Sequence, residues 1–315
     1  MPTENLAFTF FAMHGCEVQA LAMTVSIRTF AGQFKHAPIW ITVPEGHELR
    51  GEQAESLDAL DVEVIPIPAD EAIWKFPYAS KPLASAAAEA YAEGKVDVLV
   101  WIDRDGLVTG QPDAFRLPKD KLLGYRPTDM RNIGSPWDEP LTPFWQEIYS
   151  RFGIPEEKAF QFTSGGEEED RYPYINAGLL CVRPEAGILR EWKQDFLTHY
   201  QAPELLAYAK ESPVYSWLLH QALLTGTVMK LLDESQMQLL PWGYNYPSNL
   251  HHRFAAGKAA TTLDQVTSIR IDDLLTQEGW RERFAPDDPV LVWLEGLLAD
   301  CGNYYDVDEI SPMCV

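Results

Sequence analysis

The first hundred residues switch repeatedly between short apolar runs and longer segments whose apolar residues recur at helical spacing. Apolar runs of about four to eight residues predict buried strands, and apolar residues three and four positions apart predict helices. The predicted strands are residues 6–13, 38–43, 62–67 and 96–102, and the predicted helices are residues 17–30 and 81–93. This alternation predicts a parallel sheet with right-handed crossovers.

The pattern becomes irregular between residues 106 and 170, apart from a helix predicted at residues 143–151. The later predicted elements are a strand at 174–182, helices near 186–199 and 214–225, and a strand at 238–240. The tail from residue 272 is predicted to be helical and to end in a polar coil. Because the chain shows no internal repeat, we expect a main α/β domain over 1–270 and a helical extension over 271–315 packed on it.

Composition narrows the class of protein. The chain has 315 residues, of which 46% are hydrophobic, and this is enough to bury a sizeable core. Its formal net charge of -22 argues against nonspecific binding to nucleic acid or to anionic membrane, since both need clustered Lys and Arg. An acidic surface also repels free anions, so an anionic substrate needs a local cation.

Cysteine usage and hydropathy indicate the compartment. The four cysteines show no CxxC spacing and are too few for a disulfide framework or a cysteine zinc site; they are Cys16, Cys181, Cys301 and Cys314. The N-terminal apolar run lacks a basic segment before it and predicts a strand, not a signal peptide. No apolar stretch reaches the about 20 residues that span a bilayer. We expect a cytoplasmic protein without an integral membrane segment.

The most specific chemical signal is segment 96–105, VDVLVWIDRD, an apolar strand that ends in two carboxylates. Strand alternation would place Asp103 and Asp105 on one face and Arg104 on the other. Two such carboxylates can hold Mg²⁺ or Mn²⁺, which keep positions open for phosphate oxygens, although Asp pairs also occur in helix caps and turns. Ligands of open parallel sheets bind beyond the carboxyl ends of the strands, so the position favours a ligand site.

Three ordered segments resemble the GT-A nucleotide-diphospho-sugar transferases, in particular the glycogenin-like, family 8 glycosyltransferases. They are the DRD motif at 103–105, the strand YINAGLL at 174–180, and His220 and Gln221 followed by LLP at 239–241 and YN at 244–245. Lys81 lies where these enzymes place a Lys ahead of the helix that leads to the DxD strand. The resemblance covers about residues 6–250. It implies a GT-A-like α/β fold, with a Rossmann-type, mostly parallel sheet, helices on both faces and a peripheral C-terminal helical part.

The resemblance also implies an activity, the transfer of a sugar from a nucleoside-diphosphate-sugar, by analogy a UDP-sugar, to an acceptor. A bound Mn²⁺ or Mg²⁺ would stabilise the charge that develops on the leaving diphosphate. The residues expected to contact the donor are Phe10, Phe11, Ala12, Lys81, Asp103, Arg104, Asn176, Ala177 and Gly178. The candidate catalytic residues are Asn176 and Gln221, and the candidate metal ligands are Asp103, Asp105 and His252. A strand bulge at Asn176, or a Gln221 that only satisfies a backbone group, is the structural alternative.

The resemblance weakens at the C-terminal HxxGxxKPW segment, from which the family takes a His as third metal ligand. One placement uses His251 or His252, with Gly257 and Lys258 behind it, and lacks the Pro and the Trp. The other aligns the later segment SIRID with that strand and puts Arg270 at the His position. A guanidinium there would bind phosphate but would not ligate a metal. Both placements stay open on the sequence.

Two other functions remain as alternatives. A nucleotidyltransferase of the same fold usually carries a Gly-rich basic loop after the first strand, and residues 12–17 (AMHGCE) contain neither Lys nor Arg. A non-catalytic relative that binds a nucleotide or a protein is the second alternative, and the intact Asp pair argues against it. His220 stands where the family has an acid, so the resemblance assigns it no role.

Overall fold

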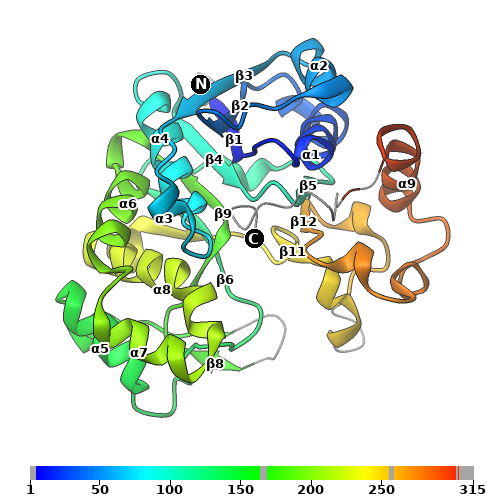
Figure 1. Ribbon diagram of the computed structural model, residues 1–315. Helices are drawn as coiled ribbons and strands as arrows, with labels where there is room; N and C mark the ends of the chain where they lie inside the picture. Colours follow the sequence, from blue (N-terminus) through cyan, green and yellow to red (C-terminus); the bar gives the residue numbers. More distant parts are fainter. Residues whose placement is uncertain (1–4, 164–168, 255–258, 303, 305–315) are drawn as a thin grey trace.

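The computed structural model describes residues 5–163, 169–254, 259–302 and 304 (Figure 1). Its centre is a seven-stranded sheet. In sheet order the strands are β10 (Met237–Leu239), β6 (Leu123–Pro127), β9 (Ile175–Val182), β4 (Val98–Ile102), β1 (Leu6–Phe11), β2 (Ile39–Pro44) and β3 (Val62–Ile67). Strand β9 runs antiparallel to both neighbours, and the other neighbouring pairs are parallel. The predicted mostly parallel α/β sheet is therefore confirmed.

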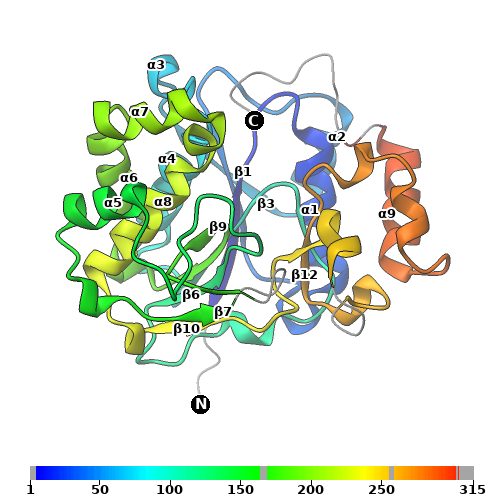
Figure 2. The same ribbon diagram turned by 90° about the horizontal axis from the view of Figure 1, so that it is seen from below.

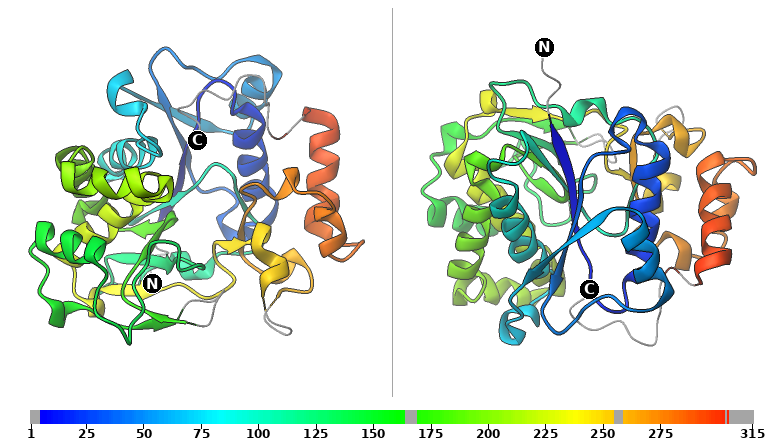
Figure 3. Two further views of the ribbon diagram at one scale, coloured as in Figure 1. Left: turned by 60° about the horizontal axis from the view of Figure 1, so that its bottom comes forward. Right: turned by 90° about the horizontal axis from the view of Figure 1, so that it is seen from above.

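Helices cover both faces of this sheet (Figures 1 and 3). One side carries α4 (Ser80–Ala92), α6 (Ile188–His199) and α8 (Pro213–Leu231), with α3 (Glu71–Trp74), α5 (Pro143–Phe152) and α7 (Pro203–Glu211) around them. The other side carries α1 (Glu17–Phe30) and α2 (Gly51–Ala59), and α9 (Pro289–Cys301) lies beside α1 (Figure 2). None of the helices in the described ranges combines the length and apolar character that crossing a membrane requires.

Two small sheets complete the strands. One contains β11 (Tyr246–Pro247), β12 (Ser268–Arg270) and β5 (Gly106–Val108), and the other pairs β7 (Phe162–Thr163) with β8 (Asp170–Arg171). Strand β12 runs antiparallel to β5 and places Arg270 opposite Gly106. The pairing continues one residue further, where the backbone N–H of Ile271 donates to the carbonyl of Asp105 at 2.8 Å. This register places β12 and Ile271 beside the segment that contains Asp103 and Asp105.

The core lies between the central strands and the helices on either face. Every residue of β1, β4 and β9 is buried, as expected for strands covered on both sides. The indole N–H of Trp101 donates to the carbonyl of Ala177 at 3.1 Å and ties β4 to β9. A separate apolar cluster joins Leu291 of α9 to Ile269 of β12 and to Ala22 of α1. The division of the chain at residue 270 stays a prediction.

Most predicted elements are confirmed, with small shifts at their ends. Helix α1 has the predicted bounds, and so does β3. Helix α8 continues past the predicted end at residue 225 to Leu231. The tail contains 3-10 turns before α9, and its predicted polar coil, like Cys314, lies outside the described residues. The predicted strands and helices before residue 103 therefore define the first half of the sheet.

The region expected to be irregular, residues 106–170, contains strands that the sequence did not predict: β5, β6, β7 and the start of β8. β6 belongs to the central sheet, where β9 and β10 pair with its two edges. Its sequence, LGYRP, does not predict a strand inside the central sheet, because it contains a glycine and an arginine. The guanidinium of Arg126 is buried and donates to the carbonyl of Leu240 at 2.8 Å. The short helices α2, α3 and α7 were not predicted either.

Candidate functional site

A pocket of about 720 Å³ opens beyond the carboxyl ends of β1 and β4. Its walls come from the ends of β1 and β6, the first turn of α4, the turn after β4, the start of β9, α8 and the end of β12. Its polar lining includes Lys81, Asp103, Arg104, Asp105, Asp129, Asn176, His220, Gln221, Arg270 and Asp272. Open α/β sheets commonly bind ligands at this edge. Most of the donor-site residues predicted from the sequence therefore converge there.

The Asp103–Asp105 segment forms a turn. β4 ends at Ile102, and the backbone N–H of Gly106 closes the turn by donating to the carbonyl of Asp103 at 2.8 Å. Asp103, Arg104 and Asp105 all line the pocket. The expectation that Arg104 points to the opposite face is wrong, because the backbone leaves the strand before Asp103 and the alternation stops there.

Lys81 and Asp103, which both line the pocket, form an ion pair. The Nζ of Lys81 lies 2.6 Å from Oδ2 of Asp103, and 18% of each side chain is exposed. Burial lowers the pKa of Lys81, but Asp103, Tyr78 and Asp105 together outweigh this and leave the pKa raised. Burial raises the pKa of Asp103, and the Lys81 charge opposes that shift. A fixed positive charge therefore sits beside the acidic turn.

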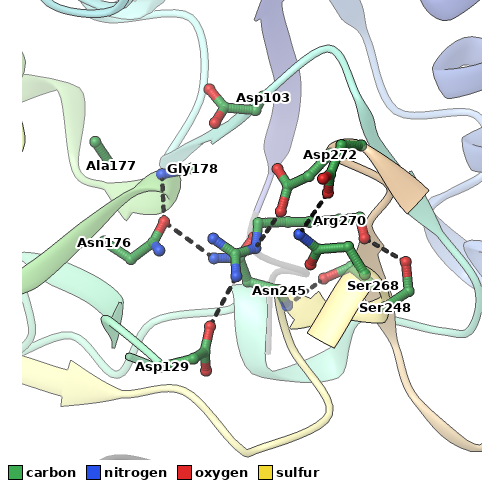
Figure 4. A network of polar contacts seen from close by, with 12 residues as sticks. Asp103, Asp129, Asn176, Ala177, Gly178, Asn245, Ser248, Ser268, Arg270 and Asp272 are labelled. Atoms are coloured by element: carbon green, nitrogen blue, oxygen red, sulfur yellow. Dashed lines mark hydrogen bonds and ion pairs between the residues drawn. The ribbon is translucent and has the colours of Figure 1, made fainter. Parts of the chain in front are cut away.

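The absence of a side chain at Gly178 leaves room for the carboxylate of Asp103. The backbone N–H of Asp103 donates to the carbonyl of Gly178 at 2.9 Å, so the turn lies directly against β9. A Cβ atom on Gly178 would lie 3.0 Å from Oδ2 of Asp103 and 2.9 Å from Oδ1 of Asn176. Figure 4 shows these side chains around Gly178. Only a residue without a side chain fits here undisturbed.

The amide oxygens of Asn176 and Gln221 are bound within the protein. Oδ1 of Asn176 accepts from the backbone N–H of Gly178 at 2.7 Å and from the side-chain amide of Asn245 at 3.2 Å. Oε1 of Gln221 accepts from the backbone N–H of Ala177 at 2.9 Å. Gln221 thus satisfies a backbone group and also lines the pocket. With the oxygens engaged, the amide nitrogens are the groups left to donate to a ligand.

Arg270 is held in the pocket wall by two carboxylates (Figure 4). Its Nη2 lies 2.8 Å from Oδ2 of Asp129, and its Nε lies 3.8 Å from Oδ2 of Asp272. Burial lowers the pKa of Arg270, but the charges of Asp272, Asp129, Asp103 and Asp105 together outweigh this, so the pKa is raised. Burial raises the pKa of Asp272 to about 6; Arg270 opposes the shift, and the Asp105 and Asp103 charges add to it. The guanidinium stays charged.

Sequence reasoning missed Asp129 and Asp272. Asp129 follows β6, which the sequence did not predict, so no pattern marked the residue as the end of a strand. Asp272 stands two positions after Arg270 and has a φ of 45°, in the left-handed region. The alternation of polar residues in IRID was the one signal available for it.

The structure does not bring His251 or His252 to the two aspartates. Nδ1 of His251 lies 2.8 Å from the hydroxyl of Tyr246, and the His251 ring packs on Phe284 at 4.5 Å. His252 is exposed, and neither histidine lines the pocket. Arg270 does, as in the second sequence placement. Within the described ranges, no three His, Cys, Asp or Glu side chains form a group that could hold a metal ion. Gly257 and Lys258 lie outside those ranges.

Three residues at the end of the first predicted strand were expected to contact the donor, and they differ in position. Phe11 lines the pocket. Phe10 and Ala12 are buried in the hydrophobic core, with 1% and 0% of their surface exposed.

Comparisons with known proteins agree with this geometry. A family model for the Rhodobacterales glycosyltransferase domain matches residues 10–225. The galactosyltransferase LgtC, solved with donor and acceptor sugar analogues, is similar over 93% of this chain and 95% of its own, with a TM-score of 0.51 and 13% identity. The bifunctional glycosyltransferase WbbM matches over 94% of this chain and 51% of its own, with a TM-score of 0.51 and 12% identity. No curated protein sequence matches the chain. The fold is that of the GT-A glycosyltransferases.

Proposed function

Because the chain belongs to the Rhodobacterales glycosyltransferase family, we propose that its pocket binds a nucleoside-diphosphate-sugar, specifically a UDP-sugar, and transfers the sugar to an acceptor. The observation that carries this proposal is the meeting of three kinds of group in one pocket. These are the carboxylates of the Asp103–Asp105 turn, the fixed cations Lys81 and Arg270, and the amides of Asn176 and Gln221. A sugar nucleotide carries matching groups, a charged diphosphate and a set of hydroxyls.

The acidic turn fits a divalent cation. Mg²⁺ commonly uses one or two protein carboxylates and completes its coordination with substrate phosphate oxygens and water. Asp103 and Asp105 are two such carboxylates on one turn, and both line the pocket. We propose that they hold Mn²⁺ or Mg²⁺ together with the donor. When bound, the cation supplies positive charge that stabilises the leaving diphosphate.

Lys81 and Arg270 supply positive charge from the protein itself. An ammonium group acts on phosphate as a compact point charge, and a planar guanidinium can bind two phosphate oxygens at once. Both side chains are held in place by carboxylates, Lys81 by Asp103 and Arg270 by Asp129. In a chain with a net charge of -22, such fixed cations are what allow an anionic donor to approach.

Asn176 and Gln221 are proposed to orient the sugar. Their oxygens accept from backbone N–H groups of β9, and this leaves the amide nitrogens as the groups that would donate to the sugar. Donors fixed before the ligand arrives cost little reorganisation when charge develops in the transition state. We assign both residues to the catalytic region on this basis.

The test compares two double variants in donor turnover. Thermal shifts with UDP, GDP and ADP first identify the bound nucleotide, since a ligand of the folded state raises the melting temperature. Hydrolysis and transfer of the matching sugar nucleotides are then measured with Mn²⁺. We expect D103A/D105A to lower kcat/KM by at least about 100-fold. The control is E55A/D58A, which removes two exposed carboxylates from α2 and leaves the rate unchanged. Wild-type turnover in D103A/D105A would refute the role of the turn.

A further inference from the structure

His220 is a buried histidine in the wall of the pocket. It lies on α8, and 2% of its surface is exposed. Its ring packs on the ring of Tyr78 at 4.9 Å and lies 6.5 Å from the ring of Trp192. Trp192 is itself anchored, because its indole N–H donates to the backbone carbonyl of His220 at 2.9 Å. The imidazole therefore has a fixed place and orientation in the wall.

The hydrogen bond of one ring nitrogen determines what the other can do. Nδ1 of His220 lies 2.9 Å from the carbonyl oxygen of Trp217. A carbonyl only accepts, so Nδ1 carries the proton, and in a neutral ring Nε2 then has a lone pair and no hydrogen. Burial, together with the nearby Lys81 charge, holds the pKa of His220 well below its usual value. The ring presents an acceptor at Nε2.

This acceptor lacks a partner within the protein. Nε2 of His220 is fully buried and makes no hydrogen bond with the described residues, although His220 lines the pocket. Buried polar atoms nearly always have a partner, and leaving one unpaired is costly. Because His220 lines the pocket, a ligand bound there is the candidate for the missing donor.

The chemistry of the donor substrate identifies that group. Phosphate oxygens at neutral pH only accept hydrogen bonds, so they cannot pair with Nε2. A sugar hydroxyl can accept from an amide nitrogen, such as that of Gln221, and still has its own hydrogen to donate. We propose, on the basis of the proposed function, that Nε2 of His220 accepts a hydrogen bond from one hydroxyl of the donor sugar. His220 is then a specificity-determining residue, which discriminates against sugars that lack this hydroxyl.

The experiment separates sugar binding from nucleotide binding. Dissociation constants of UDP, UDP-glucose, UDP-galactose and UDP-N-acetylglucosamine are measured calorimetrically with Mn²⁺. The sugar contribution is defined as the Kd of UDP divided by the Kd of the tightest UDP-sugar. H220N keeps an amide nitrogen near the position of Nδ1, which preserves the contact with Trp217, and removes the acceptor at Nε2. H220Q is longer and carries an oxygen near the position of Nε2.

We expect H220N to reduce the sugar contribution about tenfold while the Kd of UDP stays within twofold, since an unpaired polar partner typically costs this much. H220Q should retain most of the sugar contribution. The matched control is H199N, on a partly buried histidine in the last turn of α6 that does not line the pocket. It should bind every ligand like the wild type. Thermal melting establishes that each variant is folded.

The outcomes distinguish this proposal from the proposed function. If a folded H220N keeps the full sugar contribution, water alone satisfies Nε2 and the assignment of His220 is overturned. If H220N weakens UDP and UDP-sugar equally, His220 only packs, and the assignment is again overturned. If the wild type binds neither UDP nor any UDP-sugar, the proposed function fails first, whatever the variants do.

Discussion

Arg270 and Asp129 lie 141 positions apart in the sequence, and the guanidinium Nη2 donates to the Asp129 carboxylate at 2.8 Å. Asp129 is buried, and 15% of the Arg270 side chain is exposed, toward the pocket. The pairing of β12 with β5 brings Arg270 to this place. A charged guanidinium whose direction is set before the substrate arrives is suited to bind a diphosphate.

Replacing Arg270 by Lys tests the geometry of this contact and keeps the charge. R270K should raise the Kd of UDP about tenfold, because an ammonium group cannot bind two phosphate oxygens in the planar fashion of a guanidinium. The control is R283K, at an arginine that does not line the pocket. Calorimetric titration of both variants gives the comparison. Equal affinities for UDP in wild type and R270K would remove Arg270 from the diphosphate site.

R270H tests whether a side chain at position 270 can ligate the proposed cation. A histidine at this position places an imidazole in the wall that Asp103 and Asp105 also line. Imidazole and carboxylate together are suitable ligands for Mn²⁺, so the variant should bind the cation more tightly. We expect the half-saturating concentration of Mn²⁺ in donor hydrolysis to fall about tenfold relative to wild type. An unchanged Mn²⁺ requirement in an active R270H would show that position 270 is too far from the cation.

A substitution at Gly178 tests how closely the Asp103–Asp105 turn must approach β9 for activity. G178A adds a Cβ atom 3.0 Å from Oδ2 of Asp103, and either the carboxylate or the strand must move. Displacing a catalytic group by a fraction of an ångström lowers rates strongly, so kcat/KM should fall about 10- to 100-fold. The control is G296A on α9, where an added Cβ meets nothing within 4 Å. That variant should keep its activity and gain slightly in stability, because Ala favours a helix over Gly.

The sequence predicted those helices and strands whose own residues show a regular pattern of apolar positions. Helix α1 repeats apolar residues at helical spacing, and β4 is apolar throughout, so neither needs information from distant residues. β6 is different, since LGYRP becomes a strand through its pairing with β9 and β10 on its two edges. Pairings between distant segments, unlike local periodicity, leave no mark in a single sequence.

The same distinction holds for the candidate site. Asp103 and Asn176 could be predicted because Asp103 directly follows one recognisable strand and Asn176 lies at the start of another. Asp129 and Asp272 could not, because they meet only through Arg270 and the register of β12 against β5. For His220 the sequence showed a departure from the related family, and only the contact of Nδ1 with Trp217 revealed the acceptor at Nε2.

Glu89 provides a prediction for stability against pH, away from the pocket. It is fully buried on α4, where its carboxyl accepts from the backbone N–H groups of Leu189 and Arg190 at 3.1 and 2.8 Å. Burial raises its pKa to about 7, although these hydrogen bonds and the Arg190 charge oppose the shift. The folded protein therefore holds a proton that the unfolded chain releases near its ordinary pKa of about 4.3.

The sign of the effect follows from this difference in bound protons. Between about pH 4.3 and 7 the folded state binds more protons, so the contribution of Glu89 to the free energy of unfolding falls as pH rises, by up to about 4 kcal/mol. E89Q should remove this part of the pH dependence. The control is E93Q, which alters the other carboxylate paired with Arg190 at an exposed position. Urea unfolding at pH 5 and pH 8 measures the slopes, and an E89Q slope equal to that of wild type would contradict the buried, protonated Glu89.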